Sequence, residues 1–588
     1  MSETTPMPEN PGSNQPETAT APITPPARTA TVPPPPRPGR NQLILALAFA
    51  AAMGILLLLL PTIYRAHTEY LLWSEGFMEQ AFARSFLSGH FEKLIETPKP
   101  LWNMFWLLSP FPNRLFLLIV IMIAVVFFLF PYLSRKLTGS VVFGVVASLV
   151  TFFGFRDALG LMLEGSWILP VILLGLIFLL AVLSKRWGWA TVAVGLSGLI
   201  RPESWLLAIF LIVLIAVNRE RLKWYHFVPL LAPLFWAWYD YRISGDWLYS
   251  YRNTAAYAVL TGVPSVDFIS FWPRLIPDII ESTGIIALLY AVAGIIIRAR
   301  NIAHEAKERK TLAVLFDPLF AVTLLPLIAA WIMSIQGNLI IMRRFFFLSI
   351  GLMAFYAVLL PYEISRARKV ANRNFLIGAI WLPLILVALV RLPGISRDVH
   401  RGMKVTEAKM AAIVGLCEEI TKPVADLSEY RSIFIPFRRY AQFTTFLSDS
   451  IARKFISYRE VSLAVTSTQL ALLDSAPELP PGSPQFLKDL VLSRKQFADY
   501  LPALALWVPD DEVHYIDAFS FDDPDYFHKN YIDHGRYAFR IIGSALDSLG
   551  LIYDVREIEP GSVQDLLAPA SEPAPELPYR VEDQPPER

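Results

Sequence analysis

The chain is poor in cysteine and in charge. Cys417 is the only cysteine among 588 residues, which excludes an intrachain disulfide and any metal site built from several thiolates. Charged residues make up 18% of the sequence, whereas a soluble protein carries about 25%. The net charge of +1 leaves no basic excess, so no nucleic-acid partner is expected. Scarce charge combined with 54% hydrophobic residues predicts an integral membrane protein in contact with membrane lipids.

Both ends of the chain are polar and rich in proline. Residues 1–41 contain PPPPRPGR close to their end, and residues 566–588 contain the similar stretch PAPELP. Such compositions bury too little apolar surface to form a core, so both ends are predicted to be disordered, the first of them in the cytoplasm. No cleavable signal peptide is predicted, because the first apolar segment begins too far from the N-terminus.

Apolar segments recur between these ends and predict a polytopic helical bundle. Their approximate bounds are 42–63, 114–133, 139–155, 166–183, 188–200, 203–217, 226–240, 280–297, 313–335, 344–361 and 375–392. A membrane span needs about 20 residues, and the shorter segments suit a bundle that lines a water-filled cavity. The predicted fold class is therefore mainly α, with about eleven spans over residues 42–392 and an outer loop at 64–113.

Basic residues fall in alternate connections between the apolar segments, and the positive-inside rule places those connections in the cytoplasm. The residues are Arg135, Lys136, Lys185, Arg186, Arg219, Arg221, Lys223, Arg298, Arg300, Lys307, Arg309, Lys310, Arg366, Arg368, Lys369 and Arg373. The loop at 64–113 and everything after 392 are then extracytoplasmic. The predicted location is a bacterial inner (plasma) membrane, with the C-terminal part periplasmic or extracellular.

Residues 393–565 mix helical and strand-like pieces and predict one extracytoplasmic α/β soluble domain. The aspartates and histidines between Asp510 and His534 fit no metal-site spacing, so they are interpreted as a polar surface and no metal ligands are predicted.

The outer loop carries two carboxylates, Glu75 and Glu79, four residues apart and hence on one face of a helix. Carboxylates that are desolvated at a membrane interface can act as a general base or hold a divalent cation such as Mg²⁺ or Mn²⁺. The same spacing is also typical of an amphipathic helix with a solvated polar face, and both interpretations stay open. Glu164, just before an apolar segment, is by itself best interpreted as a solvated acid.

Three further polar groups lie in the predicted outer connections. Arg201 and Glu203 interrupt a long apolar stretch, and charges at membrane depth face a cavity or each other; they bind phosphate or mark a turn between spans. Asp246 follows a span in an aromatic-rich stretch. Arg343 and Arg344 stand at an outer end against the positive-inside bias, which favours phosphate binding over contact with lipid head groups.

In order along the chain, these elements resemble motifs of the GT-C superfamily of membrane glycosyltransferases, in the bacterial branch that includes the mycobacterial cell-envelope arabinofuranosyltransferases. The matching segments are Ser74-Glu75, Ala83–Gly89, Thr97–Trp102, Met162–Glu164, Gly198–Trp205, Tyr241–Asp246, Asn253-Thr254, Gly337-Asn338 and Arg344-Phe345. The resemblance covers residues 42–390, and the C-terminal domain is not part of it.

The resemblance implies a polyprenyl-phosphate-linked sugar donor and a cell-envelope glycan or lipid acceptor. It implies an acidic residue of the first outer loop as general base, here Glu75, with Glu79 or Glu164 in support. It also implies that arginines bind the donor phosphate, here Arg201 with Arg343 or Arg344. Further substrate contacts are then expected from Lys99, Trp102, Glu203 and Asp246.

One departure keeps rival hypotheses open. Where the family has an acidic pair, this chain has Ser74 followed by Glu75. A metal site built on two adjacent carboxylates is thereby weakened, so catalysis without metal, a shifted site, or a non-catalytic relative that acts as scaffold or lipid-glycan binder are the alternatives. A lipid or sugar transporter is a third hypothesis, since short broken spans such as 188–217 suit transporters; against it, the sequence has no internal repeat.

Overall fold

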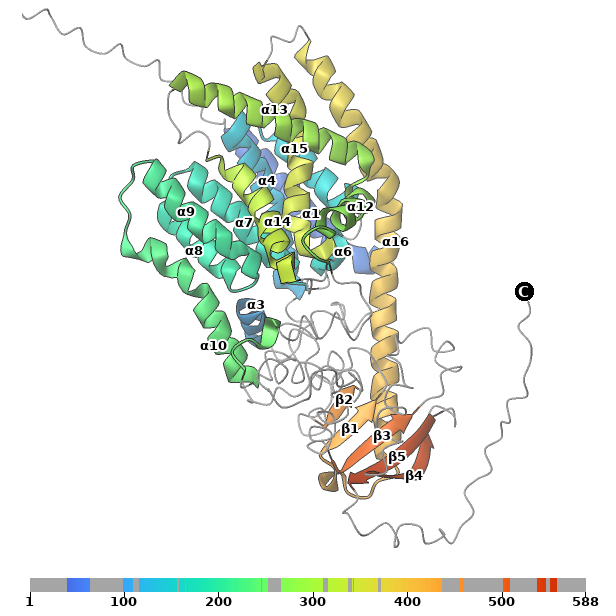
Figure 1. Cartoon of the computed structure of the whole chain (residues 1–588). Coiled ribbons are helices and arrows are strands. Elements are labelled where there is room, and N and C mark those ends of the chain that lie inside the picture. The colour runs from blue at the N-terminus through green and yellow to red at the C-terminus, as the bar shows by residue number, and fades with distance from the viewer. Residues whose placement is uncertain are drawn as a thin grey trace, which may run out of the picture.

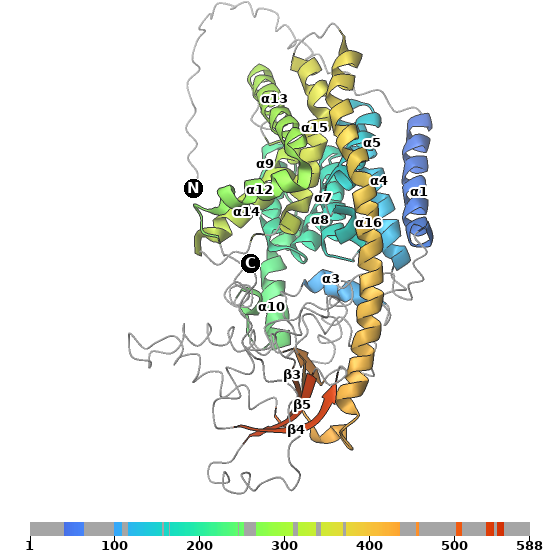
Figure 2. The same ribbon diagram turned by 90° about the vertical axis from the view of Figure 1, so that its right-hand side faces the viewer.

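The structure, a computed structural model, describes residues 40–63, 99–108, 116–155, 158–163, 165–244, 246–251, 266–309, 316–336, 341, 343–367, 372–435, 454–457, 501–507, 537–545 and 550–557. A helical bundle and a small sheet are joined by one long helix, α16 (Figures 1 and 2). Of the predicted terminal tails, only residues 40 and 41 are described, as the start of a helix. Glu75, Glu79 and Glu164 lie outside the described residues.

Each of the eleven apolar segments corresponds to a helix. The bundle elements are α1 (Arg40–Ile63), α3 (Pro100–Phe105), η1 (Trp106–Leu108), α4 (Phe116–Thr138), α5 (Val142–Leu149), the π-turn η3 (Val150–Gly154), α6 (Ala158–Leu163), α7 (Ile168–Leu183), α8 (Trp187–Gly198), η4 (Pro202–Ser204), α9 (Trp205–Val217), η5 (Trp224–Leu231), α10 (Ala232–Ser244), α12 (Phe271–Thr283), α13 (Ile285–Arg309), α14 (Pro318–Met333), η7 (Ser334–Gln336), η8 (Arg343–Phe346), α15 (Phe347–Ala367) and α16 (Arg373–Thr421). Among the described residues, α1, α4, α13, α15 and α16 are long and apolar enough to cross a membrane. The number of spans stays a prediction.

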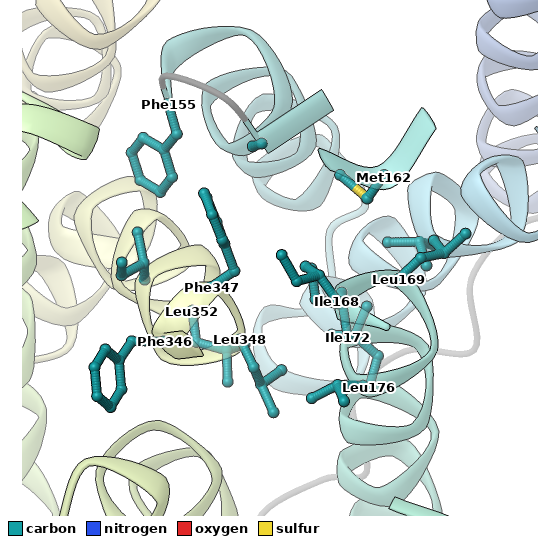
Figure 3. Packing of buried hydrophobic residues seen from close by; sticks show 14 of the residues in the cluster. Phe155, Met162, Ile168, Leu169, Ile172, Leu176, Phe346, Phe347, Leu348 and Leu352 are labelled. Carbon is teal, nitrogen blue, oxygen red and sulfur yellow. The ribbon is translucent and has the colours of Figure 1, made fainter. Parts of the chain in front are cut away.

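Helix α15 is the centre of the bundle. Of its apolar 18-residue stretch, 89% is buried, against 22% for α1 and 17% for α16, so these two present most of their side chains to lipid. In Figure 3, side chains at the start of α15 meet those of α7. A Cβ added at Gly175 of α7 would lie 2.8 Å from Leu348 of α15, and one at Gly294 of α13 would lie 2.5 Å from the Tyr356 carbonyl. Glycine at these two positions permits the close helix contacts typical of membrane bundles.

A buried ion cluster ties α13, α14 and α15 together. Arg298 Nη1 donates to Glu363 Oε1 at 2.6 Å, and Nη2 donates to Asp317 Oδ2 at 2.6 Å. The other oxygen of Asp317 accepts from Leu319 N at 2.8 Å and so caps the start of α14. Asn301 Nδ2 donates to Glu363 Oε2 at 2.9 Å. Arg298 is one of the basic residues assigned to the cytoplasmic connections, and its side chain is only 9% exposed because it lies in this cluster.

Some of the basic residues lie at the end of the bundle opposite the sheet. Helix α4 ends there with Arg135 and Lys136, and α15 ends there with Arg366, which pairs with Glu305 (Figures 1 and 2). Helices α3 and the end of α10 lie at the other end, which we call the sheet-facing end (Figure 1). The assignment of the basic end to the cytoplasm stays a prediction.

Helix α16 continues well past its membrane-spanning part. Its apolar stretch ends at Gly394, yet the helix runs unbroken to Thr421, about 40 Å farther at about 1.5 Å per residue. Arg391 fastens α16 to the bundle, since its Nη1 donates to Gly154 O at 2.6 Å and to Ser282 O at 2.8 Å. The boundary predicted at 393 therefore falls inside one continuous helix.

The sheet beyond α16 is mixed, in agreement with the predicted α/β class. Its strands are β1 (Ser432–Ile435), β2 (Phe455–Ser457), β3 (Ala503–Trp507), β4 (Tyr537–Ala545) and β5 (Gly550–Glu557), in the order β2-β1-β3-β5-β4. Strands β1, β2 and β3 are parallel, and β5 is antiparallel to β3 and β4. The starts of β1 and β3 meet beyond the end of α16, where Arg431 N donates to Pro502 O at 2.8 Å.

Candidate functional site

Arg201 lies in the tight connection between α8 and α9 at the sheet-facing end. Pro202 begins the next helical turn, and the residue before a proline is driven into extended backbone, so Arg201 has φ −142° and ψ 124°. Its N–H donates to Ser197 O at 2.9 Å, and its own carbonyl accepts from Ser204 N at 3.1 Å. The local sequence thus ends one helix and starts the next around a fixed arginine.

The Arg201 guanidinium is held by the Glu203 carboxylate. Arg201 Nε donates to Glu203 Oε2 at 2.9 Å, and Nη2 donates to Oε1. The two side chains are only 15% and 10% exposed, so this two-bond fork is largely shielded from water. The predicted mutual pairing of these charges is therefore what the structure shows.

Two aromatic rings flank the same guanidinium. Arg201 Cζ lies 4.2 Å from the ring centre of Trp167 and 4.7 Å from that of Phe345. The two ring centres are 5.9 Å apart and their planes are inclined by 40°. Within the described part of the chain, the fork and the rings leave Nη1 of Arg201 without a hydrogen bond, so the guanidinium is fixed in place with N–H groups to offer to an anion.

Helix α3 is bonded to two of the turns that surround Arg201. Trp102 Nε1 donates to Gly165 O at 3.0 Å, and Leu101 N donates to Leu199 O at 3.3 Å. Trp102 is 2% exposed and stacks on Phe105, with ring centres 4.5 Å apart. The predicted contact of Trp102 with substrate stays a prediction, while in this structure its contacts are with protein.

Lys99 is the residue before α3, and it is 5% exposed. Its backbone N–H donates to Asn103 Oδ1 at 2.6 Å, and Pro100 occupies the first helical position. Lys99 therefore lies at the sheet-facing end, two residues from the Leu101–Leu199 contact.

Asp246 caps a turn in the connection after α10, and its contact with substrate stays a prediction. Its Oδ1 accepts from Leu248 N at 2.9 Å, a local turn contact. The carboxylate buried nearby belongs to Asp240, which is 2% exposed and accepts from both Ser250 N and Ser250 Oγ. Asp240 could have been found from the sequence, because it is an acid at the end of the apolar stretch LFWAWYDY and acids in such positions are usually paired.

Of the motif residues that the structure describes, Trp102, Arg201 and Phe345 lie close together at the sheet-facing end. Arg343 and Arg344 begin η8, the same short turn as Phe345, but their side chains lie outside the described residues. Glu164 is likewise outside, although Gly165 next to it accepts the Trp102 bond. Among the described residues, no group of three or more His, Cys, Asp or Glu side chains is placed to hold a metal ion.

Sequence reasoning missed the two rings that hold Arg201. Trp167 and Phe345 come from segments 34 residues before and 144 residues after it in the chain. The adjacency of Phe345 to the double arginine was the only local sign of its role, because ring contacts between distant segments leave no sequence pattern.

An apolar groove of about 700 Å³ runs along α8, between that helix and the η5–α10 segment. It extends from Gly188 near the basic end to Leu199, two residues before Arg201. Between these ends it is lined by Val192, Gly195, Val228 and Phe235. Eleven residue steps of α8 correspond to about 16 Å, roughly half the hydrocarbon thickness of a bilayer.

The structure is similar to two solved structures of one protein. One match is ArnT from Cupriavidus metallidurans bound to undecaprenyl phosphate, with a TM-score of 0.45, 13% identity, and coverage of 90% of this chain and 99% of that chain. A second is ArnT of the same organism in the apo state, with a TM-score of 0.40, 14% identity and the same coverage. No family model and no curated protein matches the chain. Because both TM-scores lie below 0.5, no residue role or substrate is transferred from ArnT.

Proposed function

We propose that this protein is a membrane glycosyltransferase that moves a sugar from a polyprenyl-phosphate donor to an envelope glycan or lipid at its sheet-facing end. The observation that carries the proposal is the Arg201 guanidinium, held by Glu203 and flanked by Trp167 and Phe345. A preformed, partly shielded guanidinium is suited to a phosphate monoester or diester. Its neighbours Arg343 and Arg344 would add positive charge.

Glu75 of the outer loop is the proposed general base. It takes the proton of the acceptor hydroxyl while that oxygen bonds to the anomeric carbon of the sugar. The bond from the anomeric carbon to the phosphate oxygen breaks, and its electron pair leaves with polyprenyl phosphate. Arg201 stabilises the charge that develops on this leaving phosphate. No step requires a metal ion, although Mg²⁺ or Mn²⁺ bound by the outer-loop carboxylates stays an alternative.

The groove along α8 is the proposed place of the isoprenoid chain. Its wall is almost entirely apolar, and its outer end at Leu199 lies beside the Arg201 turn. A lipid whose phosphate is at Arg201 would thus have its chain directed into the membrane along α8. The location of the groove and the location of the guanidinium therefore support the same ligand, a long apolar chain with a phosphate at one end.

A non-catalytic lipid-glycan binder is the second candidate, and Ser74 favours it. The Arg201 site and the groove would serve binding equally well, while the acidic pair of the family is incomplete here. The two candidates make the same prediction for donor binding and opposite predictions for transfer.

Replacing Arg201 by lysine is expected to weaken binding of undecaprenyl phosphate by about 10- to 100-fold. Lysine keeps the charge but loses the planar fork, and a hydrogen bond to a charged group contributes about 1.5–3 kcal/mol. The measurement is a titration of the purified protein in detergent, followed by native mass spectrometry. Arg366→Lys is the matched control, because Arg366 also pairs with a glutamate but at the opposite end of the bundle. Equal affinity of wild type and both variants for undecaprenyl phosphate would contradict Arg201 as the phosphate-binding residue.

A leucine at Gly195 is expected to reduce affinity for long polyprenyl phosphates by about tenfold, comparable to losing about two buried methylene groups. A Cβ at Gly195 meets Pro229 only at 3.6 Å, so the backbone tolerates the change and the longer side chain fills the groove. Gly378→Leu on the exposed side of α16, where nothing lies within 4 Å, is the control. Titration with long- and short-chain phosphates decides the matter, since an equal loss for both lengths would contradict a chain site in this groove.

A further inference from the structure

A second polar contact system lies beside the Arg201 site, and the proposed reaction does not use it. It begins at Asp240, near the end of α10. Both carboxylate oxygens accept from one residue, with Ser250 N 2.9 Å from Oδ2 and Ser250 Oγ 2.7 Å from Oδ1. Because Ser250 belongs to the connection that follows α10, these bonds fasten the start of that connection onto the helix.

The contacts continue from Ser250 to the turn that carries Arg201. Ser250 Oγ accepts from Trp236 Nε1 at 3.0 Å. The Trp236 ring meets the Trp205 ring edge to face, with centres 6.3 Å apart and planes at 79°. Trp205 Nε1 then donates to Gly198 O at 2.9 Å, three residues before Arg201.

The helices that carry this series of contacts are tightly packed. A Cβ added at Gly198 would lie 3.1 Å from Trp205 Cδ1 and 3.2 Å from Ala232, so α8, α9 and α10 are in close contact there. The adjacent Ser197 joins the same turn twice, since its carbonyl accepts from Arg201 N and its Oγ bonds to Ser204 Oγ at 2.8 Å. A displacement of Trp205 therefore moves the backbone that holds Arg201.

We propose that Asp240 is a positioning residue for the phosphate-binding turn. By fixing Ser250, it fixes Trp236 and Trp205, and through them the turn at Gly198 that sets the place of the Arg201 guanidinium. The phosphate as ligand rests on the proposed function, whereas the mechanical link from Asp240 to the turn does not.

The first test is hydrogen exchange of the backbone amides between Gly198 and Trp205, measured on the full chain. Asp240→Leu removes both acceptors while keeping a side chain that branches at Cγ, and it is expected to speed exchange at Arg201 N and Ser204 N. Asp267→Leu is the matched control, because Asp267 likewise accepts from Ser270 N (2.6 Å) and Ser270 Oγ (2.7 Å), and it is not part of the series of contacts from Asp240 to Gly198. Unchanged exchange in Asp240→Leu would overturn the proposal.

The second test is a double-variant cycle on undecaprenyl phosphate affinity. Asp240→Leu is expected to weaken binding about tenfold alone and to add nothing in an Arg201→Lys background, because coupled residues do not act additively. Asp240→Asn keeps an acceptor and is expected to lie between. Fully additive losses would show that Asp240 acts elsewhere and would overturn the proposal.

The outcomes separate the two levels of inference. If wild type binds no polyprenyl phosphate while Asp240→Leu still speeds exchange at the turn, the positioning role stands and the proposed function falls. If Asp240→Leu does not fold, Trp236→Phe replaces it, since phenylalanine keeps a ring against Trp205 and removes only the bond to Ser250. Slow, wild-type exchange in Trp236→Phe would then overturn the proposal.

Discussion

Glu75→Gln is expected to slow sugar transfer by about 10²- to 10⁴-fold, the usual contribution of a general base, while leaving lipid affinity unchanged. Glutamine keeps the shape of the side chain and cannot take up the proton of the acceptor hydroxyl. The measurement uses purified protein, a labelled polyprenyl-phosphate sugar and a membrane glycan extract. Glu79→Gln is measured in parallel, because Glu79 is the second acid of the outer loop.

Each result of this comparison has a definite meaning. Equal transfer by wild type and Glu75→Gln would place the base elsewhere, with Glu79 and Glu164 as the remaining acids. No transfer by either protein, combined with lipid binding by both, would show that the change to Ser74 has ended catalysis. The protein would then be the scaffold or lipid-glycan binder of the second candidate. Transport of the sugar across vesicles without transfer would instead favour the transporter hypothesis.

Arg298→Met is expected to lower the free energy of unfolding by about 3–5 kcal/mol, because it leaves two buried carboxylates without their cation. Methionine roughly keeps the volume of the side chain but none of its three hydrogen bonds to Asp317 and Glu363. The measurement is a denaturant titration in detergent micelles, followed by near-ultraviolet circular dichroism.

Arg366→Met serves as the control for this loss, because Arg366 is 43% exposed and its pair with Glu305 is worth about 0–1 kcal/mol. In the combined variant with Asp317→Asn and Glu363→Gln, most of the lost stability is expected to return, since no uncompensated charge remains. An effect of Arg298→Met no larger than that of Arg366→Met would contradict the buried ion cluster as a source of stability.

Helix positions in the bundle were predictable because apolar length is a local property of the sequence. The extent of α16 was not, because hydropathy reports surroundings and not helicity. After Gly394 the chain turns polar, but segments such as EAKMAAIVGL are still composed mainly of good helix formers. Helix α12 was missed for the opposite reason: its prolines and alternating charges gave no apolar segment to detect.

The candidate site was predictable only in its local parts. Arg201 and Glu203 are two residues apart, so their pairing was among the sequence alternatives, and the structure selects it. The partners of Arg298 are 19 and 65 residues away, and those of Asp240 depend on the path of a connection. Contacts of this kind follow from tertiary packing, which a single sequence does not reveal.

The length of helix α16 also determines how far the sheet lies from the bundle and how it is rotated about the helix axis. Since it is unbroken from the membrane to Thr421, each residue inserted after Gly394 would raise the sheet by about 1.5 Å and turn it by about 100° around the helix axis. Substitutions in this part of the helix leave the orientation of the sheet unchanged. Insertions and deletions preserve the orientation only when they add or remove nearly whole turns, such as about seven, eleven or eighteen residues. The part of α16 after Gly394 is therefore a rigid spacer, and its length decides which face of the sheet is turned toward the bundle.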